Sequence, residues 1–136
     1  HVSNLMRYKK QLATIDTQDA LIGNRAYDLA SLIDDVRFKS NQKLKDNIYN
    51  YYLRLNDAKV NKVILLNDFK ILSVIRNMKI IGIFTRLAAR DKKKKYLKLI
   101  PHAWKLIELR MQNNQIFDGL KRVLDINFPK KIRNLK

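Results

Sequence analysis

Two oxygen-bearing side chains near the start of the chain have the types and spacing of metal ligands. Residues 4–8 and 12–16 predict two short β-strands joined by a basic loop, with Asn4 beginning the first strand and Asp16 ending the second. The strands of a hairpin are antiparallel, so these two residues lie at the same end of the ribbon. Carboxylate and amide oxygens hold the divalent metal in phosphoryl transfer. Asn and Asp are also common in turns, so the pair by itself only suggests a metal site.

The rest of the chain has a helical pattern. After Gly23, apolar residues at positions 26, 29, 30 and 33 follow the i, i+3, i+4, i+7 spacing of one helix face. Pro101 lies near the first turn of a later helix, and Pro129 is expected to end the ordered pattern. Helices are predicted near 24–33, 41–56, 67–89, from about 101, and 114–126. The expected fold class is therefore mainly α, with one β-hairpin followed by about five helices.

The second predicted helix has an apolar side of its own. In the window 41–56, the apolar positions are assigned to one side of the helix, which should face the core. The residues on that side are Leu44, Ile48, Tyr51, Tyr52 and Leu55.

Composition excludes several classes of protein. The 136 residues contain no Cys and only two His, which excludes a disulfide framework and makes a zinc enzyme improbable. The most apolar stretch, "KIIGIFTRLAA", is bounded by Lys79 and Arg86 and is much shorter than the roughly 20 residues of a membrane span. No N-terminal signal pattern is visible. The expectation is a cytoplasmic protein with no membrane partner.

The net charge of +17 has two interpretations. Lysines that neutralise phosphates would give affinity for a polyanion, so a basic helical nucleic-acid-binding domain is the alternative from another functional class. A Lys-rich composition gives the same charge without any partner, and the only dense run, "RDKKKK" at 90–95, suits a solvated loop. The carboxylates concentrate in the hairpin and first helix, where a polyanion binder would have none. No nucleic-acid partner is therefore expected.

The segment "HVSNLM … ATIDTQDALIGNRAYDLASLIDD" resembles the catalytic segment of the aminoglycoside phosphotransferase and choline kinase superfamily, which shares the protein-kinase fold. The family has a catalytic-loop pattern H-x-D-x-x-x-x-N, a strand pair, an "ID" segment and a "YDLA"-type helix. The resemblance implies that Asn4 and Asp16 bind metal and that Asp28 is a structural brace for the catalytic loop. By the same match, the catalytic Asp would lie two residues before His1, so no catalytic residue is expected within the chain.

A narrower resemblance covers roughly residues 1–35 and 76–97. The stretches "DTQDALIGNRAYDLASLIDD" and "MKIIGIFTRLAARDKKKKYL" are similar to bacterial anomeric sugar kinases, which phosphorylate N-acetylmuramate and N-acetylglucosamine in cell-wall recycling. Thr17 replaces the usual Phe, and Lys93 stands where relatives tend to have Gly. The resemblance implies ATP and Mg²⁺ as cofactors and an amino sugar as acceptor. An aminoglycoside or another small alcohol is the alternative acceptor.

Four further residues are candidates for substrate binding. His1 lies three residues from Asn4, and Asp19 follows the "TID" segment, where it would face substrate, hold a second metal or cap the next segment. Arg86 and Arg90 are one turn apart on the long helix and would line a sugar or phosphate pocket, unless they are solvated or ion-paired.

The resemblance also predicts how the chain is organised. The whole chain, 1–136, is expected to be the C-terminal lobe of a protein-kinase-like fold, with a metal-binding hairpin segment at 1–22 and a helical subdomain at 23–136. The N-terminal lobe is expected to be absent, so the chain alone should be inactive as a kinase. A degenerate, non-catalytic homologue is the remaining alternative.

Overall fold

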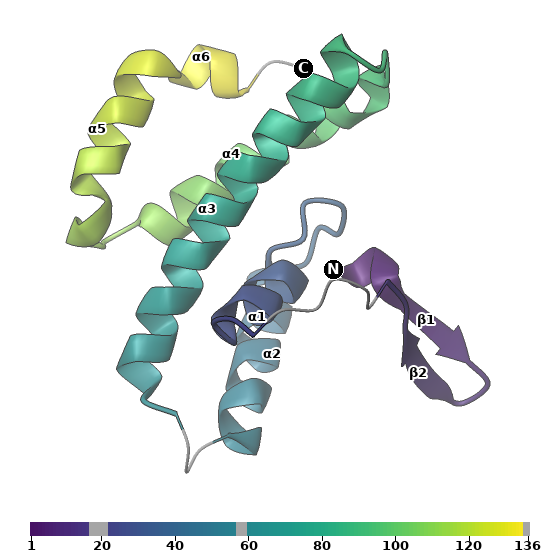
Figure 1. The fold of residues 1–136 in the computed structure, drawn as a ribbon. Helices are drawn as coiled ribbons and strands as arrows, with labels where there is room; N and C mark the ends of the chain where they lie inside the picture. Colours follow the sequence, from purple (N-terminus) through teal and green to yellow (C-terminus); the bar gives the residue numbers. More distant parts are fainter. Residues whose placement is uncertain (17–21, 57–59, 135–136) are drawn as a thin grey trace. The chain divides into compact units, whose positions relative to one another are not determined.

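The computed structural model describes residues 1–16, 22–56 and 60–134, and Figure 1 shows a hairpin followed by helices. The strands are β1 (Leu5–Tyr8) and β2 (Gln11–Thr14), preceded by a 3₁₀ turn η1 (Val2–Asn4). The mainly α class with one leading hairpin, expected from the sequence, is confirmed. The helices are α1 (Ala26–Ile33), α2 (Gln42–Leu55), α3 (Lys62–Ala89), α4 (Ile100–Met111), α5 (Asp118–Asn127) and α6 (Lys130–Arg133), with 3₁₀ turns η3 (Lys94–Leu99) and η4 (Gln115–Phe117).

The chain separates into two compact units, His1–Leu72 and Ser73–Lys136, called here the N-terminal and C-terminal units. The hairpin, α1, α2 and the first turns of α3 belong to the N-terminal unit, and all later elements belong to the C-terminal unit. The sequence predicts a different division, between a metal-binding hairpin segment at 1–22 and a helical subdomain at 23–136. That division is by function and not by compact unit, and it stays a prediction.

The core of the N-terminal unit forms where α1 and the start of α3 bury their apolar faces. On α1 the residues at 26, 29, 30 and 33 are all buried, as the helical spacing predicts. Leu65 and Phe69 of α3 meet them, and the Tyr49 ring packs against Phe69 with centroids 5.3 Å apart. Partly buried side chains complete this core: Ile48, Tyr49, Tyr52, Leu53, Val60 and Leu72.

The buried side of α2 differs in part from the expected one. Ile48 and Tyr52 pack against the core as predicted, but Leu44, Tyr51 and Leu55, predicted on the same side, are exposed. The buried position is Lys45, whose Nζ lies 2.7 Å from Oδ1 of the fully buried Asp34 at the end of α1. The core-facing side of α2 therefore includes Lys45, whose buried ammonium is compensated by the Asp34 carboxylate.

The C-terminal unit buries side chains from α3, α4 and α5. Phe84 packs against Tyr96 of η3 with ring centroids 5.0 Å apart, and Trp104 of α4 packs against Phe128 at 5.5 Å. Pro129 does not end the ordered pattern as expected, because α6 follows it, with Pro129 in the N-cap position, where a missing N–H costs nothing. In the part of the chain that the structure describes, no helix has the length and apolar character needed to cross a membrane.

Candidate functional site

The hairpin brings the start of β1 and the end of β2 together. Its register pairs Leu5 with Thr14 and Tyr8 with Gln11, leaving a two-residue turn at Lys9 and Lys10. Lys9 has φ of 53°, the left-handed conformation that tight hairpin turns require. This register places the residue before β1 beside the residues that follow β2.

Asn4 and Asp16 are in direct contact at this end of the hairpin. The Asn4 side-chain amide donates to Asp16 Oδ2 over 3.0 Å, and the Asn4 carbonyl accepts from the Ile15 N–H over 2.9 Å. Asp16 has φ of 62°, a left-handed conformation that Asp tolerates better than most residues and that directs the chain away from the strand. The backbone therefore holds the carboxylate and the amide next to each other.

The oxygen groups of this pair suit a magnesium ion shared with a bound phosphate. The Asn4–Asp16 contact is solvent-exposed, so an ion can reach the carboxylate and the amide oxygen. Within the described ranges, no group of three or more His, Cys, Asp or Glu side chains could enclose a metal alone. Mg²⁺ usually takes one or two protein oxygens and completes its octahedron with water and substrate phosphates. The pair fits that partial set of ligands.

A buried carboxylate, Asp35, holds the 3₁₀ turn that carries Asn4, while the predicted role of Asp28 as a brace of the catalytic loop stays a prediction. Asp35 is only 1% exposed, and its Oδ2 accepts from the Val2 N–H over 2.9 Å. Its Oδ1 accepts from the Arg37 N–H over 3.0 Å. Asp28 is exposed on α1, which does not match the burial expected of a brace. The reason is geometric, because position i+2 from Ala26 points away from the i, i+3, i+4, i+7 face.

Replacing Asp35 with Ala should lower the free energy of unfolding by about 1–3 kcal/mol, because the Val2 and Arg37 amides lose their acceptor. Urea unfolding followed by circular dichroism measures the change. Asp28→Ala is the matched control on the same segment, and its exposed site predicts a change below about 1 kcal/mol. Equal effects of the two substitutions would show that Asp35 does not fix the turn.

The other predicted substrate residues are placed as follows. The His1 side chain is exposed, and its carbonyl accepts from the Asn4 N–H over 2.9 Å, so both belong to the same turn. Asp19 lies outside the described residues. Arg86 and Arg90 are exposed in the C-terminal unit, and Arg90 Nε is 2.6 Å from Asp91 Oδ1. This hydrogen bond, helped by the nearby charges of two other basic residues, lowers the pKa of the Asp91 carboxyl.

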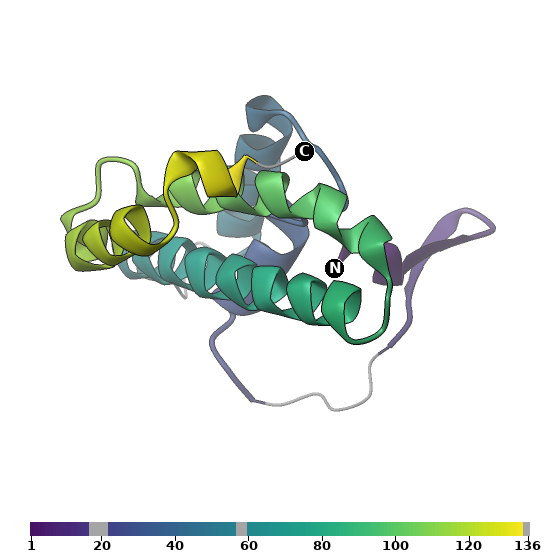
Figure 2. The same ribbon diagram turned by 90° about the horizontal axis from the view of Figure 1, so that it is seen from above.

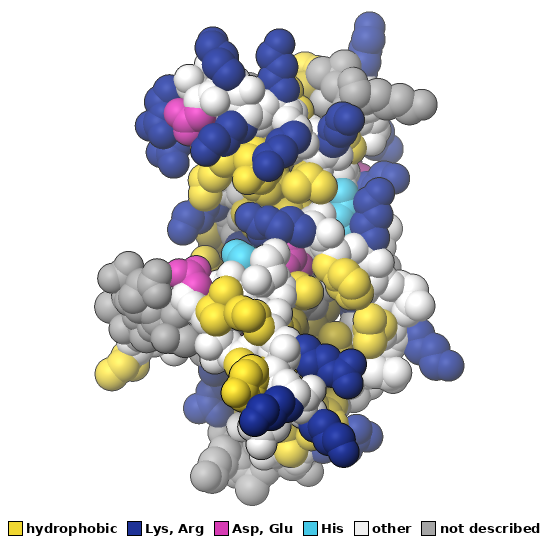
Figure 3. Space-filling model, turned by 90° about the vertical axis from the view of Figure 1, so that its right-hand side faces the viewer, with side chains coloured by type: hydrophobic (Ala, Val, Ile, Leu, Met, Phe, Trp, Pro, Cys, Tyr) yellow, Lys and Arg dark blue, Asp and Glu magenta, His cyan; other side chains and the backbone are white. Residues whose placement is uncertain are grey.

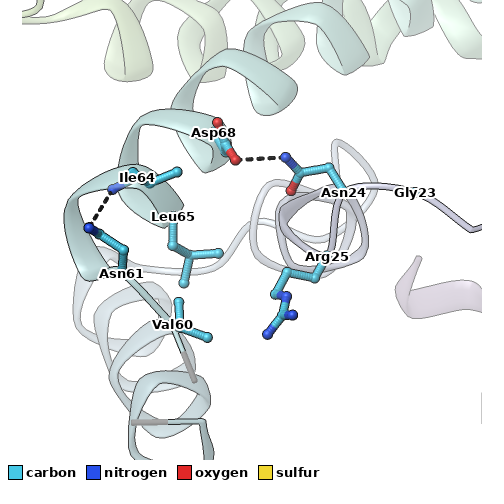
Figure 4. A pocket seen from close by; sticks show the side chains of 8 residues that line it. All are labelled: Gly23, Asn24, Arg25, Val60, Asn61, Ile64, Leu65 and Asp68. Atoms are coloured by element: carbon cyan, nitrogen blue, oxygen red, sulfur yellow. Dashed lines mark hydrogen bonds between the residues drawn. The ribbon is translucent and has the colours of Figure 1, made fainter. Parts of the chain in front are cut away.

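A separate polar hollow lies between the starts of α1 and α3, with a volume of about 310 Å³ (Figure 4). Asn24 donates from Nδ2 to Asp68 Oδ2 over 2.6 Å and accepts the Ala26 N–H at Oδ1. Asn61 caps α3 by accepting the Val63 and Ile64 N–H groups. These hydrogen bonds satisfy the helix starts, so the polar residues have a structural role in this hollow. Its lining is Gly23, Asn24, Arg25, Val60, Asn61, Ile64, Leu65 and Asp68.

Two buried carboxylates were missed from the sequence: Asp34, which pairs with Lys45, and Asp35, which holds the turn that carries Asn4. Both belong to the quoted segment "SLIDD", and Asp34 occupies the i+8 position of the α1 apolar face that begins at Ala26. A carboxylate at such a position must be buried and paired. That signal could have identified Asp34, whereas Asp35 lies past the helix end, where the periodicity gives no guidance.

Comparisons with known proteins give sugar kinases as relatives. The chain matches no protein-family model. It is 33% identical over 105 residues to an N-acetylmuramate/N-acetylglucosamine kinase of Neisseria meningitidis, covering 74% of this chain and 31% of the relative. Proteins of the same name from Pseudomonas aeruginosa and Caulobacter vibrioides are 31% identical over 111 residues and 27% identical over 99 residues. These matches cover 77% and 73% of this chain but only 32% and 27% of the relatives. The matches support a relationship to sugar kinases, and the chain spans about a third of the length of these relatives.

Proposed function

We propose that these 136 residues are the C-terminal part of an ATP-dependent phosphotransferase that phosphorylates an amino sugar of the N-acetylmuramate or N-acetylglucosamine type. The observation that carries the proposal is the contact between Asn4 and Asp16, the two residues matched to metal ligands from the sequence. Similarity to kinases named for these two sugars supports the acceptor class.

In this proposal, Asn4 and Asp16 hold Mg²⁺ through the amide oxygen and the carboxylate. The ion neutralises charge on the ATP phosphates during phosphoryl transfer. Asp35 is a positioning residue, because its hydrogen bond from the Val2 N–H fixes the turn that presents Asn4. The left-handed backbone of Asp16 keeps its carboxylate against Asn4. The contribution of these residues is orientation and charge placement rather than covalent chemistry.

In this proposal, the catalytic base and the groups that cover the ATP phosphates lie outside the 136 residues. A carboxylate upstream of His1 would accept the proton of the sugar hydroxyl, and a separate glycine-rich lobe with a Lys would cover the phosphates. His1, Asp19, Arg86 and Arg90 are kept as candidate contacts to sugar or phosphate. An aminoglycoside or another small alcohol remains the alternative acceptor for the same machinery.

The test is a phosphorylation assay on the product of the complete reading frame that encodes these residues. With Mg-ATP, it should phosphorylate N-acetylmuramate or N-acetylglucosamine, detected by ³¹P NMR and by ADP release. The 136-residue chain alone should give no product, and its Mg-ATP affinity should be about millimolar or weaker, because most phosphate donors lie elsewhere.

Two outcomes of this assay would count against the proposal. Phosphorylation of kanamycin or choline, with neither amino sugar used, would move the acceptor to the alternative class. Micromolar Mg-ATP binding or sugar phosphorylation by the 136-residue chain itself would show that the chain is not a partial enzyme. Calorimetric titration with Mg-ATP measures the affinity directly.

A further inference from the structure

The last helices of the C-terminal unit carry an exposed apolar surface. Figures 1 and 2 show α5 and α6 at one edge of this unit. Phe117, at the N-cap of α5, and Leu124 within the helix are buried, whereas Ile126 is 79% exposed. Val123 and Ile126 are three residues apart on α5 and share one face of that helix, and further exposed apolar residues precede and follow it in η4, at its C-cap and in α6. This apolar ridge consists of Ile116, Val123, Ile126, Phe128 and Ile132.

Specific contacts fix the orientation of the ridge. Arg133 is 3% exposed and donates to Glu108 of α4, to Asp125 of α5 and to the Phe128 carbonyl over 2.5–2.9 Å. Its guanidinium also lies 5.0 Å from the centre of the Trp104 ring. These contacts tie α5 and α6 to α4 with Leu124 inward, so the ridge cannot turn inward without breaking them. Exposure of the apolar side is therefore built into the packing.

The helices that carry the ridge hold four exposed basic residues beside two exposed carboxylates, Asp118 and Asp125 of α5. Lys121 and Arg122 of α5 and Lys130 and Lys131 of α6 are all exposed. Residues 73–136 contain 17 Lys or Arg and 4 Asp or Glu, so this unit carries +13 of the net charge of +17. Figure 3 views the side opposite to α5, and there too Lys and Arg far outnumber Asp and Glu, in keeping with the net charge of +17. The occupant of such a surface must be both apolar and negatively charged.

Charge and apolarity together distinguish the possible occupants. A second copy of the chain would bring the same basic side chains against each other, which like-charge repulsion opposes. A nucleic acid would neutralise the lysines but would leave Ile126 and its neighbours in water. An anionic bilayer satisfies both, since an amphipathic helix with basic residues lies in the headgroup region with its apolar side inserted.

We propose that the apolar ridge of α5 and α6 attaches the protein to the surface of an anionic phospholipid membrane. Val123 and Ile126 enter the acyl boundary, while Lys121, Arg122, Lys130 and Lys131 contact lipid phosphates. The expectation of no membrane partner rested on the lack of a spanning stretch in the sequence, and a helix lying in the interface needs no such length. This attachment is independent of the phosphotransferase proposal.

Vesicle co-sedimentation tests the role of the ridge. The 136-residue protein should bind vesicles of equal parts phosphatidylglycerol and phosphatidylcholine and should not bind vesicles of phosphatidylcholine alone. Ile126→Gln should weaken binding about tenfold, the loss expected from withdrawing one large apolar side chain. Ile75→Gln is the matched control, because Ile75 is 54% exposed in the same unit but lies on α3, outside the ridge.

A second set of variants tests whether vesicle binding depends on the basic residues beside the ridge or only on the total positive charge of the protein. Replacing Lys121, Arg122, Lys130 and Lys131 by Gln should weaken binding at least about tenfold. The control replaces Lys9, Lys10, Lys39 and Lys43, four exposed lysines of the N-terminal unit, and should weaken binding much less. Circular dichroism verifies that every variant is folded.

Three results would overturn the proposal. One is failure of the wild-type 136-residue chain to bind anionic vesicles. Failure of the complete reading-frame product to bind them would count equally, because it would mean that another part of the protein covers the ridge. Another is equal binding by Ile126→Gln and wild type, which would mean attachment by charge alone. The third is a dimer in sedimentation velocity that Ile126→Gln dissociates, which would make a second copy the occupant.

Discussion

Replacing Lys45 with Met should lower the free energy of unfolding by about 3–5 kcal/mol, the cost typical of breaking a buried ion pair by removing one partner. Met keeps most of the apolar volume of the lysine stem, so the loss reports the ammonium group. Asp34 is fully buried, and the substitution removes the ammonium that lies 2.7 Å from its carboxylate. Small domains are stable by only about 5–15 kcal/mol, so this loss would be a large share of the total stability. Thermal and urea unfolding measure the change.

Two variants make this result specific. Lys43→Met removes the same charge two residues away on α2, where the side chain is exposed, and should change stability by less than about 0.5 kcal/mol. The double variant Asp34→Leu with Lys45→Met removes both charges and should recover most of the stability lost by Lys45→Met alone. A Lys45→Met protein as stable as Lys43→Met would mean that the ion pair does not hold α1 against α2.

Replacing Asp16 with Asn should reduce the rate of phosphoryl transfer by at least about a hundredfold in the product of the complete reading frame. Loss of a residue that only supports a metal ligand costs about 10–100-fold, and Asp16 is proposed to be a ligand itself. Asn retains the volume and the hydrogen bond with Asn4 but lacks the negative charge that favours Mg²⁺. Steady-state kinetics at several Mg²⁺ concentrations measure the change, and excess Mg²⁺ should recover part of the lost activity.

Asp46→Asn is the control for this substitution. Asp46 is an exposed carboxylate on α2 that accepts a hydrogen bond from Gln42, so its replacement removes the same charge away from the hairpin. Its activity should equal that of wild type. Asp16→Asn activity within a few-fold of wild type, at limiting Mg²⁺, would remove Asp16 from the proposed metal site.

Local signals located most of the helices. Asn41 caps α2 as its position in the sequence suggests, and α1 ends at the last residue of its apolar repeat. The start of α3 was placed near Asn67, but Asn61 caps the helix and adds the run "KVIL". That run is apolar and rich in β-branched residues, so composition alone does not separate a strand from a helix there. Asn61, Asn67 and Asp68 could each cap the start of this helix, and only the packing of the folded chain selects Asn61.

Contacts between charged groups that lie far apart in the sequence were not predicted. The sequence pattern gave α2 an apolar side that included Leu44, whereas the structure buries Lys45 because Asp34 of another helix compensates its charge. Pairing between distant residues is invisible to a periodicity argument. The same holds for the contact of Asp35 with Val2, which spans 33 positions. Asn4 and Asp16 were identified because a hairpin is a local structure, and their proximity follows from its register.

The hairpin that carries Asn4 and Asp16 contributes little buried surface. None of the eight residues of β1 and β2 is buried, and an isolated two-stranded hairpin is marginally stable in water. Its local opening should therefore require much less free energy than unfolding of the N-terminal unit. Only the closed population presents both proposed ligands, so under the proposed function the apparent ion affinity is the intrinsic affinity reduced by the open fraction. Whatever covers the hairpin then raises metal affinity by population shift, without touching the ion.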